Sequence, residues 1–224
     1  MKNEGNSISD SSEPSNSIAL TDSTNSFIPK SDRFNSLREK VQGKLIYDTI
    51  WQQGRTNIYM TLLSLKHLRD KEFGGIYVNQ WRWGESHPEH EWTYFDTLSC
   101  DWQDVAIHAD LDSIIILDID NDNQDEILIV YTLDCTTDVS PNTRYLVALD
   151  TEGKIKIKLK GWTKDPASMT DISKINLEYN PKTDDYNPTS PEGKIENYTA
   201  LDKLDRKAKG QLIGLWKLAL AKDK

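Results

Sequence analysis

The sequence is poor in cysteine, in basic residues and in long apolar runs. Its 224 residues include two cysteines, too few to form a zinc site by themselves. No run approaches about 18 consecutive apolar residues, which excludes a membrane-spanning helix on sequence grounds. The chain has 27 Lys and Arg against 36 Asp and Glu, and the resulting net charge of −9 argues against a general nucleic-acid-binding protein. The sequence also lacks a G-x-S-x-G motif, a phosphate-binding loop and a catalytic Cys-His signature.

Residues 1–32 are rich in Ser and Asn, and their sparse apolar residues show no period. Such a segment cannot bury enough surface to offset its ordering entropy, so we expect a disordered tether. No basic n-region followed by an apolar h-region marks a signal peptide. Two interpretations remain open: a cytosolic protein with a disordered start, or an exported lipoprotein without its signal peptide and lipidated cysteine.

Residues 33–224 are predicted to form a single, mainly β domain of antiparallel sheets, arranged as a sandwich or like a propeller blade. Short runs of aromatic and β-branched residues predict its strands, and Gly74-Gly75 predicts a turn. The expected strands cover residues 43–51, 57–65, 76–83, 91–98, 113–117, 126–133, 145–149 and 154–159.

Three of these strands carry more specific patterns. The nearly continuous apolar runs at 113–117 and 126–133 predict central strands that are covered on both faces. Lysines alternate with apolar residues in 154–159, which predicts an edge strand, joined to the preceding strand by a hairpin connection at 150–153.

The end of the chain predicts one helix, over residues 199–222. Its apolar residues recur at spacings of three and four, and Thr199 with Asp202 resembles a capping box with the shorter acid. The expected apolar stripe comprises Leu201, Leu204, Ala208, Leu212, Leu215, Trp216 and Ala219.

Five carboxylates fall within nine residues at 118–126, between the two strongest strands. Carboxylates at positions 1, 3 and 5 of a tight loop can point into one centre, where their mutual repulsion favours a cation. Hard oxygen ligands suit Ca²⁺. We therefore predict a calcium site whose ligands are Asp118, Asp120, Asp122, the carbonyl of Gln124, and Glu126.

The loop differs from an EF-hand. Position 12 is Ile129 rather than Glu, the flanking segments are strands, and the sharp turn at position 6 falls on Asn123 rather than Gly. Asn is the best non-glycine residue for a positive φ. The alternative is a solvated acidic hairpin.

Other candidate groups are weaker. His87 and His90 lie on a Pro-containing loop, where we expect them to be solvated. Seven tryptophans suit either a sugar-stacking surface or the core of a β domain. Cys100 and Cys135 are enough for one disulfide, or they are two separate buried thiols.

The acidic loop carries a family resemblance. The run DIDNDNQDEI at 118–127 is similar to the calcium loops of FG-GAP and VCBS-type extracellular β repeats. The longer stretch from Cys100-Asp101 to Cys135-Thr-Thr-Asp-Val-Ser-Pro141 resembles exported bacterial proteins described as surface polysaccharide biosynthesis proteins. The resemblance covers roughly residues 43–220, and its forty central residues are the specific part. It implies an exported, lipoprotein-like β domain and no established activity.

From this resemblance we expect a non-enzymatic, calcium-binding domain at the periplasmic or cell-surface side of the envelope. Its expected partner is a protein or polysaccharide, and its contact with the membrane is through a lipid anchor only. Export also permits the disulfide, so we predict that Cys100 pairs with Cys135.

Two alternative functions stay open. One is a periplasmic inhibitor or immunity-type protein that binds a basic partner. The other is an enzyme acting on envelope glycans, with acid and base drawn from Asp101, Asp104 or Asp112.

Overall fold

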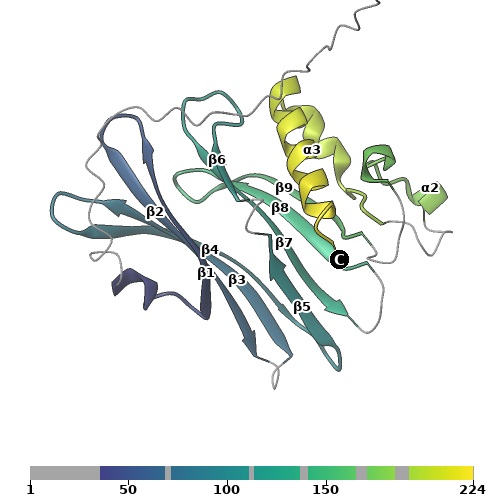
Figure 1. Cartoon of the computed structure of the whole chain (residues 1–224), viewed down its shortest axis with the longest axis horizontal. Helices are drawn as coiled ribbons and strands as arrows, with labels where there is room; N and C mark the ends of the chain where they lie inside the picture. Colours follow the sequence, from purple (N-terminus) through teal and green to yellow (C-terminus); the bar gives the residue numbers. More distant parts are fainter. Residues whose placement is uncertain are drawn as a thin grey trace, which may run out of the picture.

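The described part of the chain forms two antiparallel β-sheets and a C-terminal helix (Figure 1). The computed structural model describes residues 36–68, 72–110, 114–136, 141–164, 171–184 and 192–223. The predicted tether, 1–32, lies outside these residues. The first sheet has the order β1-β2-β3-β4, and its strands are β1 (Lys44–Gln53), β2 (Asn57–Leu68), β3 (Phe73–Trp83) and β4 (Pro88–Ser99).

The second sheet has the order β5-β7-β8-β9, with β6 paired to β7. Its strands are β5 (Asp104–Ala109), β6 (Ile115–Leu117), β7 (Glu126–Thr136), β8 (Thr143–Leu149) and β9 (Ile155–Trp162). Residues 36–38 are helical, and the later helical segments are η3 (Ile172–Lys174), α2 (Pro181–Asp184), η4 (Tyr198–Lys203) and α3 (Arg206–Leu220). This arrangement confirms the predicted mainly β class with one long C-terminal helix.

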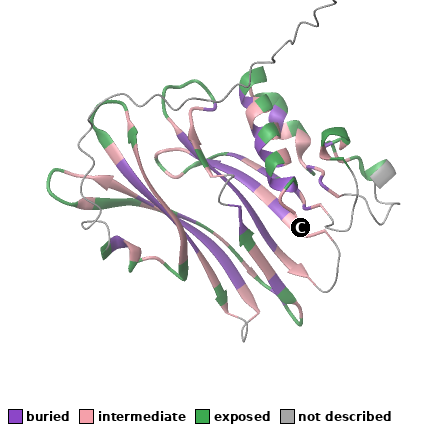
Figure 2. Ribbon diagram, in the orientation of Figure 1, coloured by how far each residue is buried: buried purple, intermediate pink, exposed green. Residues whose placement is uncertain are grey.

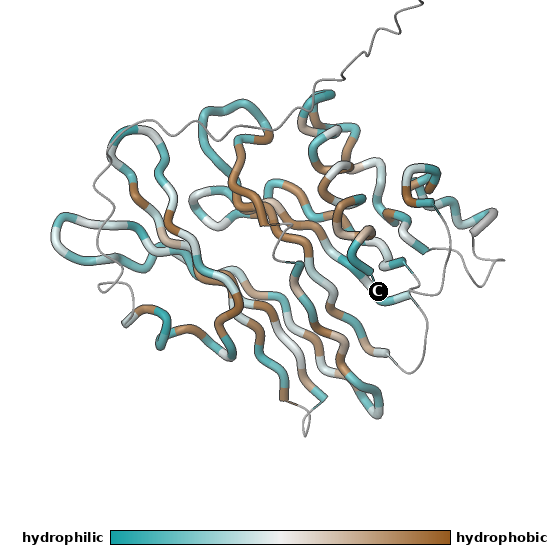
Figure 3. Tube along the Cα trace, viewed as in Figure 1, coloured by the Kyte–Doolittle hydropathy of each residue, from teal (hydrophilic) through white to brown (hydrophobic). Residues whose placement is uncertain are grey.

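Strand β7 lies at the centre of the molecule and is buried along most of its length (Figure 2). Ile127 and Ile129 pack toward the first sheet, against a cluster that includes Val78. Leu128 and Val130 point the other way, toward the helix layer. The sheets therefore form a sandwich, and α3 covers the second sheet from outside. The nearly continuous apolar run of β7, brown in Figure 3, follows from burial on both faces.

The C-terminal helix begins later than predicted. Residues 198–203 form the 3-10 helix η4, Leu204 is extended, and α3 begins at Arg206. The N-cap is Asp205, whose carboxylate accepts a hydrogen bond from the main-chain N–H of Ala208 over 2.8 Å, so the predicted cap at Thr199 is wrong. The apolar stripe still reaches the core, through Leu201, Ala208, Leu212, Leu215, Trp216 and Ala219.

The predicted turn at Gly74-Gly75 is also wrong, because both glycines lie inside β3. A Cβ atom at Gly74 would lie 2.4 Å from Cγ1 of Val105 in β5. Glycine is needed at this position because the two sheets approach each other closely, and the chain does not reverse there.

The run at 113–117 does not form the expected central strand. The described strand is the short β6, which pairs with β7 alone and leaves Ile115 38% exposed; residue 113 lies outside the described residues. By contrast, β9 ends the strand order of the second sheet, as predicted from its lysines. Among the described residues no helix has both the length and the apolar character needed to cross a membrane.

Candidate metal centre

The acidic loop connects β6 to β7. These strands pair antiparallel, with Leu117 opposite Glu126, so the intervening residues form a tight connection. Asn121 and Asn123 have φ values of 60° and 65° there. Asparagine tolerates this left-handed conformation better than most residues, and the value at Asn123 agrees with the sharp turn predicted at position 6.

Two carboxylates of the loop each have one buried oxygen without a hydrogen-bond partner among the described residues. Oδ2 of Asp118 accepts a hydrogen bond from the main-chain N–H of Asn123 over 3.0 Å, and Oε2 of Glu126 accepts one from Ile119 over 2.8 Å. Oδ1 of Asp118 and Oε1 of Glu126 are buried and have no hydrogen-bond partner among the described residues. Unsatisfied buried carboxylate oxygens are costly, so this pair of oxygens points to a ligand.

The next two carboxylates share one ammonium group. Oδ1 of Asp120 accepts a hydrogen bond from the main-chain N–H of Asp122 over 3.3 Å. Oδ1 of Asp122 accepts one from the main-chain N–H of Gln124 over 2.8 Å. Their second oxygens lie 2.9 Å and 3.1 Å from Nζ of Lys156, in β9. Hydrogen bonding to Asp120, and then to Asp122, raises the pKa of Lys156, while the bond from Lys156 lowers the pKa of Asp122.

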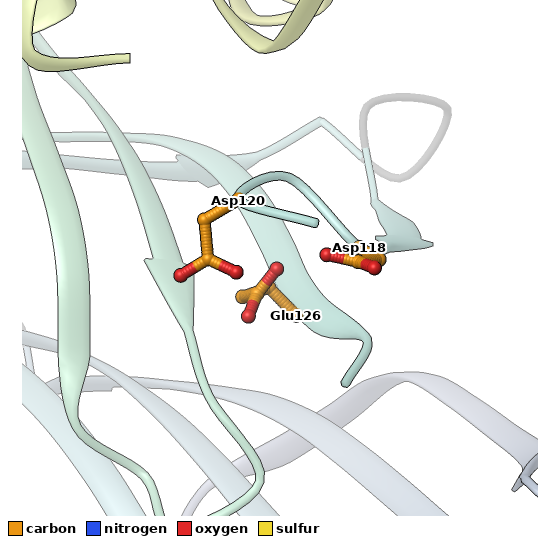
Figure 4. A group of neighbouring side chains, drawn as sticks. All are labelled: Asp118, Asp120 and Glu126. Atoms are coloured by element: carbon orange, nitrogen blue, oxygen red, sulfur yellow. The ribbon is translucent and has the colours of Figure 1, made fainter. Parts of the chain in front are cut away.

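Asp118, Asp120 and Glu126 form a compact group in which one ligand oxygen from each lies within 4.8 Å of the others (Figure 4). Glu126 is completely buried at the start of β7. Burial, helped by the nearby charges of Asp120 and Asp122 and opposed by the hydrogen bond from Ile119, raises the pKa of its carboxyl to about 7. A cation at this point would relieve both the burial cost and the mutual repulsion.

The other two predicted ligands lie differently. Asp122 is outside this compact group, although Lys156 holds one of its oxygens as it does one of Asp120. The side chain of Gln124 accepts a hydrogen bond from Thr151 over 3.0 Å, which leaves only its main-chain carbonyl for the predicted role.

The sequence interpretation missed two residues of this site. The sequence pattern predicts only that Lys156 protects an edge strand, because the alternation of lysines gives no sign of its partners. Asp205 is the second, because its Oδ2 accepts a hydrogen bond of 2.6 Å from Nδ2 of Asn121. Both contacts depend on packing between elements distant in sequence.

The remaining candidates fall elsewhere. Cys100 and Cys135 form a disulfide with a Cα–Cα distance of 5.6 Å, as predicted. His87 and His90 are both exposed, as predicted, and form hydrogen bonds with Ser86 and Thr93 respectively.

The tryptophans divide between core and surface. Trp216 is fully buried and its Nε1 donates to the carbonyl oxygen of Gly193 over 2.9 Å, and Nε1 of Trp92 donates to that of Thr151 over 2.7 Å. Trp102 is 94% exposed. Of the carboxylates considered for glycan hydrolysis, Asp101 and Asp104 are exposed and Asp112 lies outside the described residues.

Comparison with known proteins identifies no relative that could assign a function to this site. No protein-family model matches the chain, and neither a curated protein nor a solved structure matches it.

Proposed function

We propose that this protein is a non-enzymatic, calcium-binding β domain of the bacterial cell envelope. The observation that carries the proposal is the pair of buried, unpartnered oxygens on Asp118 and Glu126. They lie beside a third carboxylate, Asp120, in a loop whose main-chain N–H groups already orient every one of these side chains. Carboxylate oxygens fixed in this way favour a hard cation, whose charge would also keep Glu126 ionised.

The chemistry of the ligands favours Ca²⁺ over Mg²⁺. Calcium accepts six to eight oxygen ligands at about 2.3–2.6 Å in flexible geometry, which suits carboxylates supplemented by a carbonyl and water. Magnesium demands tight octahedral geometry and gives up its water reluctantly. Asp118, Asp120, Asp122 and Glu126 would hold the ion through side-chain oxygens, with the carbonyl of Gln124 as a further ligand.

The envelope location is supported by the Cys100–Cys135 disulfide, since such bonds persist mainly in oxidising compartments. In this proposal the Ser- and Asn-rich segment 1–32 tethers the domain to a lipid anchor at the periplasmic or outer surface. The domain then acts by binding a protein or polysaccharide partner, in a role linked to surface polysaccharide assembly.

Thermal unfolding in millimolar Ca²⁺ and in EGTA tests the proposal. Binding to the folded state alone should add about 2.7 kcal/mol at a hundredfold excess over Kd. Asp120→Ala should lose most of this gain, and in EGTA it should cost less than about 1 kcal/mol because its ion pair with Lys156 is partly exposed. Identical melting curves for the unmutated protein with and without calcium would refute the proposal.

A second candidate, an inhibitor or immunity-type protein for a basic partner, is favoured by Trp102. This exposed residue has a φ of 65°, and its main-chain N–H is held by the Glu72 carboxylate over 2.9 Å. An exposed tryptophan beside Asp101 and Asp104 suits an apolar pocket with a basic rim.

The test of this candidate is co-purification with the products of neighbouring genes. Binding should be lost in Trp102→Ala and kept in Leu218→Ala, which removes another exposed apolar side chain. Equal binding by the two variants would exclude Trp102 as the contact residue.

A further inference from the structure

Lys156 reaches the acidic loop from another part of the second sheet. It lies in β9, the edge strand, 36 residues after Asp120 and 34 residues after Asp122 in the sequence. Its ammonium group bridges these two carboxylates at 2.9 Å and 3.1 Å. The side chains on both sides of the bridge are only about one-third exposed, at 32% for Lys156, 33% for Asp120 and 35% for Asp122.

The neighbouring lysines of the same strand region have different partners. Lys154 pairs with Glu152 on an open surface, where both side chains are more than two-thirds exposed. Lys158 pairs with Asp96 over 2.7 Å, in the first sheet. Lys156 is therefore the lysine of this alternating set whose charge is directed at the metal loop.

The bridge divides the oxygens of the site into two pairs. One pair, on Asp118 and Glu126, is buried without a hydrogen-bond partner, and the other pair, on Asp120 and Asp122, is held by Lys156. A calcium ion cannot be satisfied by two carboxylate oxygens, because it requires six to eight ligands. It gains the second pair only when the ammonium group gives them up, since two cations cannot share the same oxygens without strong repulsion.

We infer that Lys156 is an internal cation that Ca²⁺ displaces from Asp120 and Asp122, and that this competition weakens the calcium affinity of the site. The inference rests on the proposed function and adds to it the residue that sets its affinity. Without metal, the single positive charge of Lys156 offsets part of the repulsion between the carboxylates of Asp120 and Asp122. With metal, the free energy of breaking the bridge is subtracted from that of binding.

The test is a calcium titration by calorimetry on the full chain with the variant Lys156→Met, which keeps the aliphatic stem. Kd should fall by about tenfold or more, the equivalent of about 1.4 kcal/mol for two partly exposed ion pairs. Lys154→Met is the matched control, because it removes the same charge two residues away without breaking a contact to the loop. Its Kd should stay within about twofold of the unmutated value, since separated exposed charges are screened by salt.

A second measurement follows the ammonium group itself. In EGTA, the NMR signal of the Lys156 side-chain ammonium group should show slowed hydrogen exchange, and saturating Ca²⁺ should abolish this protection. Lys156→Arg restores a cation to the site and should keep the weak affinity. Far-ultraviolet circular dichroism confirms that each variant is folded.

The outcomes separate this inference from the proposed function. If the unmutated protein binds calcium and Lys156→Met binds it no more tightly, the inference is overturned and the proposed function stands. If only Lys156→Met binds calcium, native calcium binding is refuted, and with it the displacement of Lys156 by calcium. If neither binds, both fail.

Discussion

Asn121, in the acidic loop, donates a hydrogen bond from Nδ2 to Oδ2 of Asp205 over 2.6 Å, and this joins the loop to the start of α3. The other oxygen of the same carboxylate caps the helix through the main-chain N–H of Ala208. One side chain therefore couples the candidate metal loop to the helix that covers the second sheet.

This coupling predicts a graded effect of two substitutions. Asn121→Gly removes the side-chain amide, and glycine tolerates the local φ of 60°. The free energy of unfolding should therefore fall by about 1 kcal/mol, the value of the lost hydrogen bond. Asp205→Ala removes both the loop contact and the N-cap, and should cost about 1 kcal/mol more. Urea unfolding measures both. If Asp205→Ala costs no more than Asn121→Gly, the cap contributes nothing and the coupling fails.

Glu126 predicts how the metal-free protein responds to pH. Its pKa is raised to about 7 in the fold from an ordinary value of 4.5, so the folded state favours the protonated acid. The associated stability is complete below the unfolded pKa and is lost as the pH rises through the folded pKa. In EGTA the free energy of unfolding should therefore decline between about pH 5 and about pH 8.

Glu126→Gln is the control for this pH effect, because the neutral amide keeps the shape and does not titrate. Its unfolding free energy should be flatter over the same pH interval, and calcium should flatten the profile of the unmutated protein. Parallel profiles for the two proteins in EGTA would show that Glu126 is not the titrating group.

The close approach of the two sheets at Gly74 predicts an unusual cost for a single methyl group. Gly74→Ala should destabilise the fold by about 1–3 kcal/mol, because the new Cβ would meet Cγ1 of Val105 at 2.4 Å. Combining it with Val105→Ala should cost less than the sum of the two changes. Gly210→Ala is the control: its Cβ would meet nothing within 4 Å in α3, and it should stabilise by up to about 1 kcal/mol. Additive costs at Gly74 and Val105 would contradict this packing.

The Cys100–Cys135 disulfide closes a long segment that contains β5, β6 and the acidic loop. Replacing both cysteines by serine should lower the free energy of unfolding by about 3–4 kcal/mol in the chain-entropy model for a sequence separation of 35. Urea unfolding of the oxidised protein and the double variant measures the difference. Two titratable thiols in the denatured, unreduced protein from an oxidising compartment would show that the bond does not form.

The sequence was most informative where local pattern and burial agree. The apolar run of β7 was predicted correctly because both faces of that strand are covered, and the turn at Asn123 because few residues tolerate its φ. The turn predicted at Gly74 failed because glycine there serves contact with β5, and a glycine pair has the same local signature in either role.

The helix start was also misplaced, because Thr199 and Asp205 both precede acceptable helical sequence and only packing selects the second. The contact between Lys156 and the loop could not be predicted for a related reason. It requires the pairing of β8 with β9, which brings Lys156 to residues more than 30 positions earlier. Residue spacing alone contains no information about such a contact.

The most direct test of the central claim is a calorimetric titration of Ca²⁺ into protein that has been freed of metal, with Glu126→Gln measured in parallel. The account predicts saturable binding of one Ca²⁺ per chain and weak competition by Mg²⁺. It also predicts at least about a tenfold loss of affinity in the variant, equal to about 1.4 kcal/mol, because one buried anionic ligand is replaced by a neutral amide. Absence of saturable calcium binding by the unmutated protein, or equal affinity in the variant, would contradict the account.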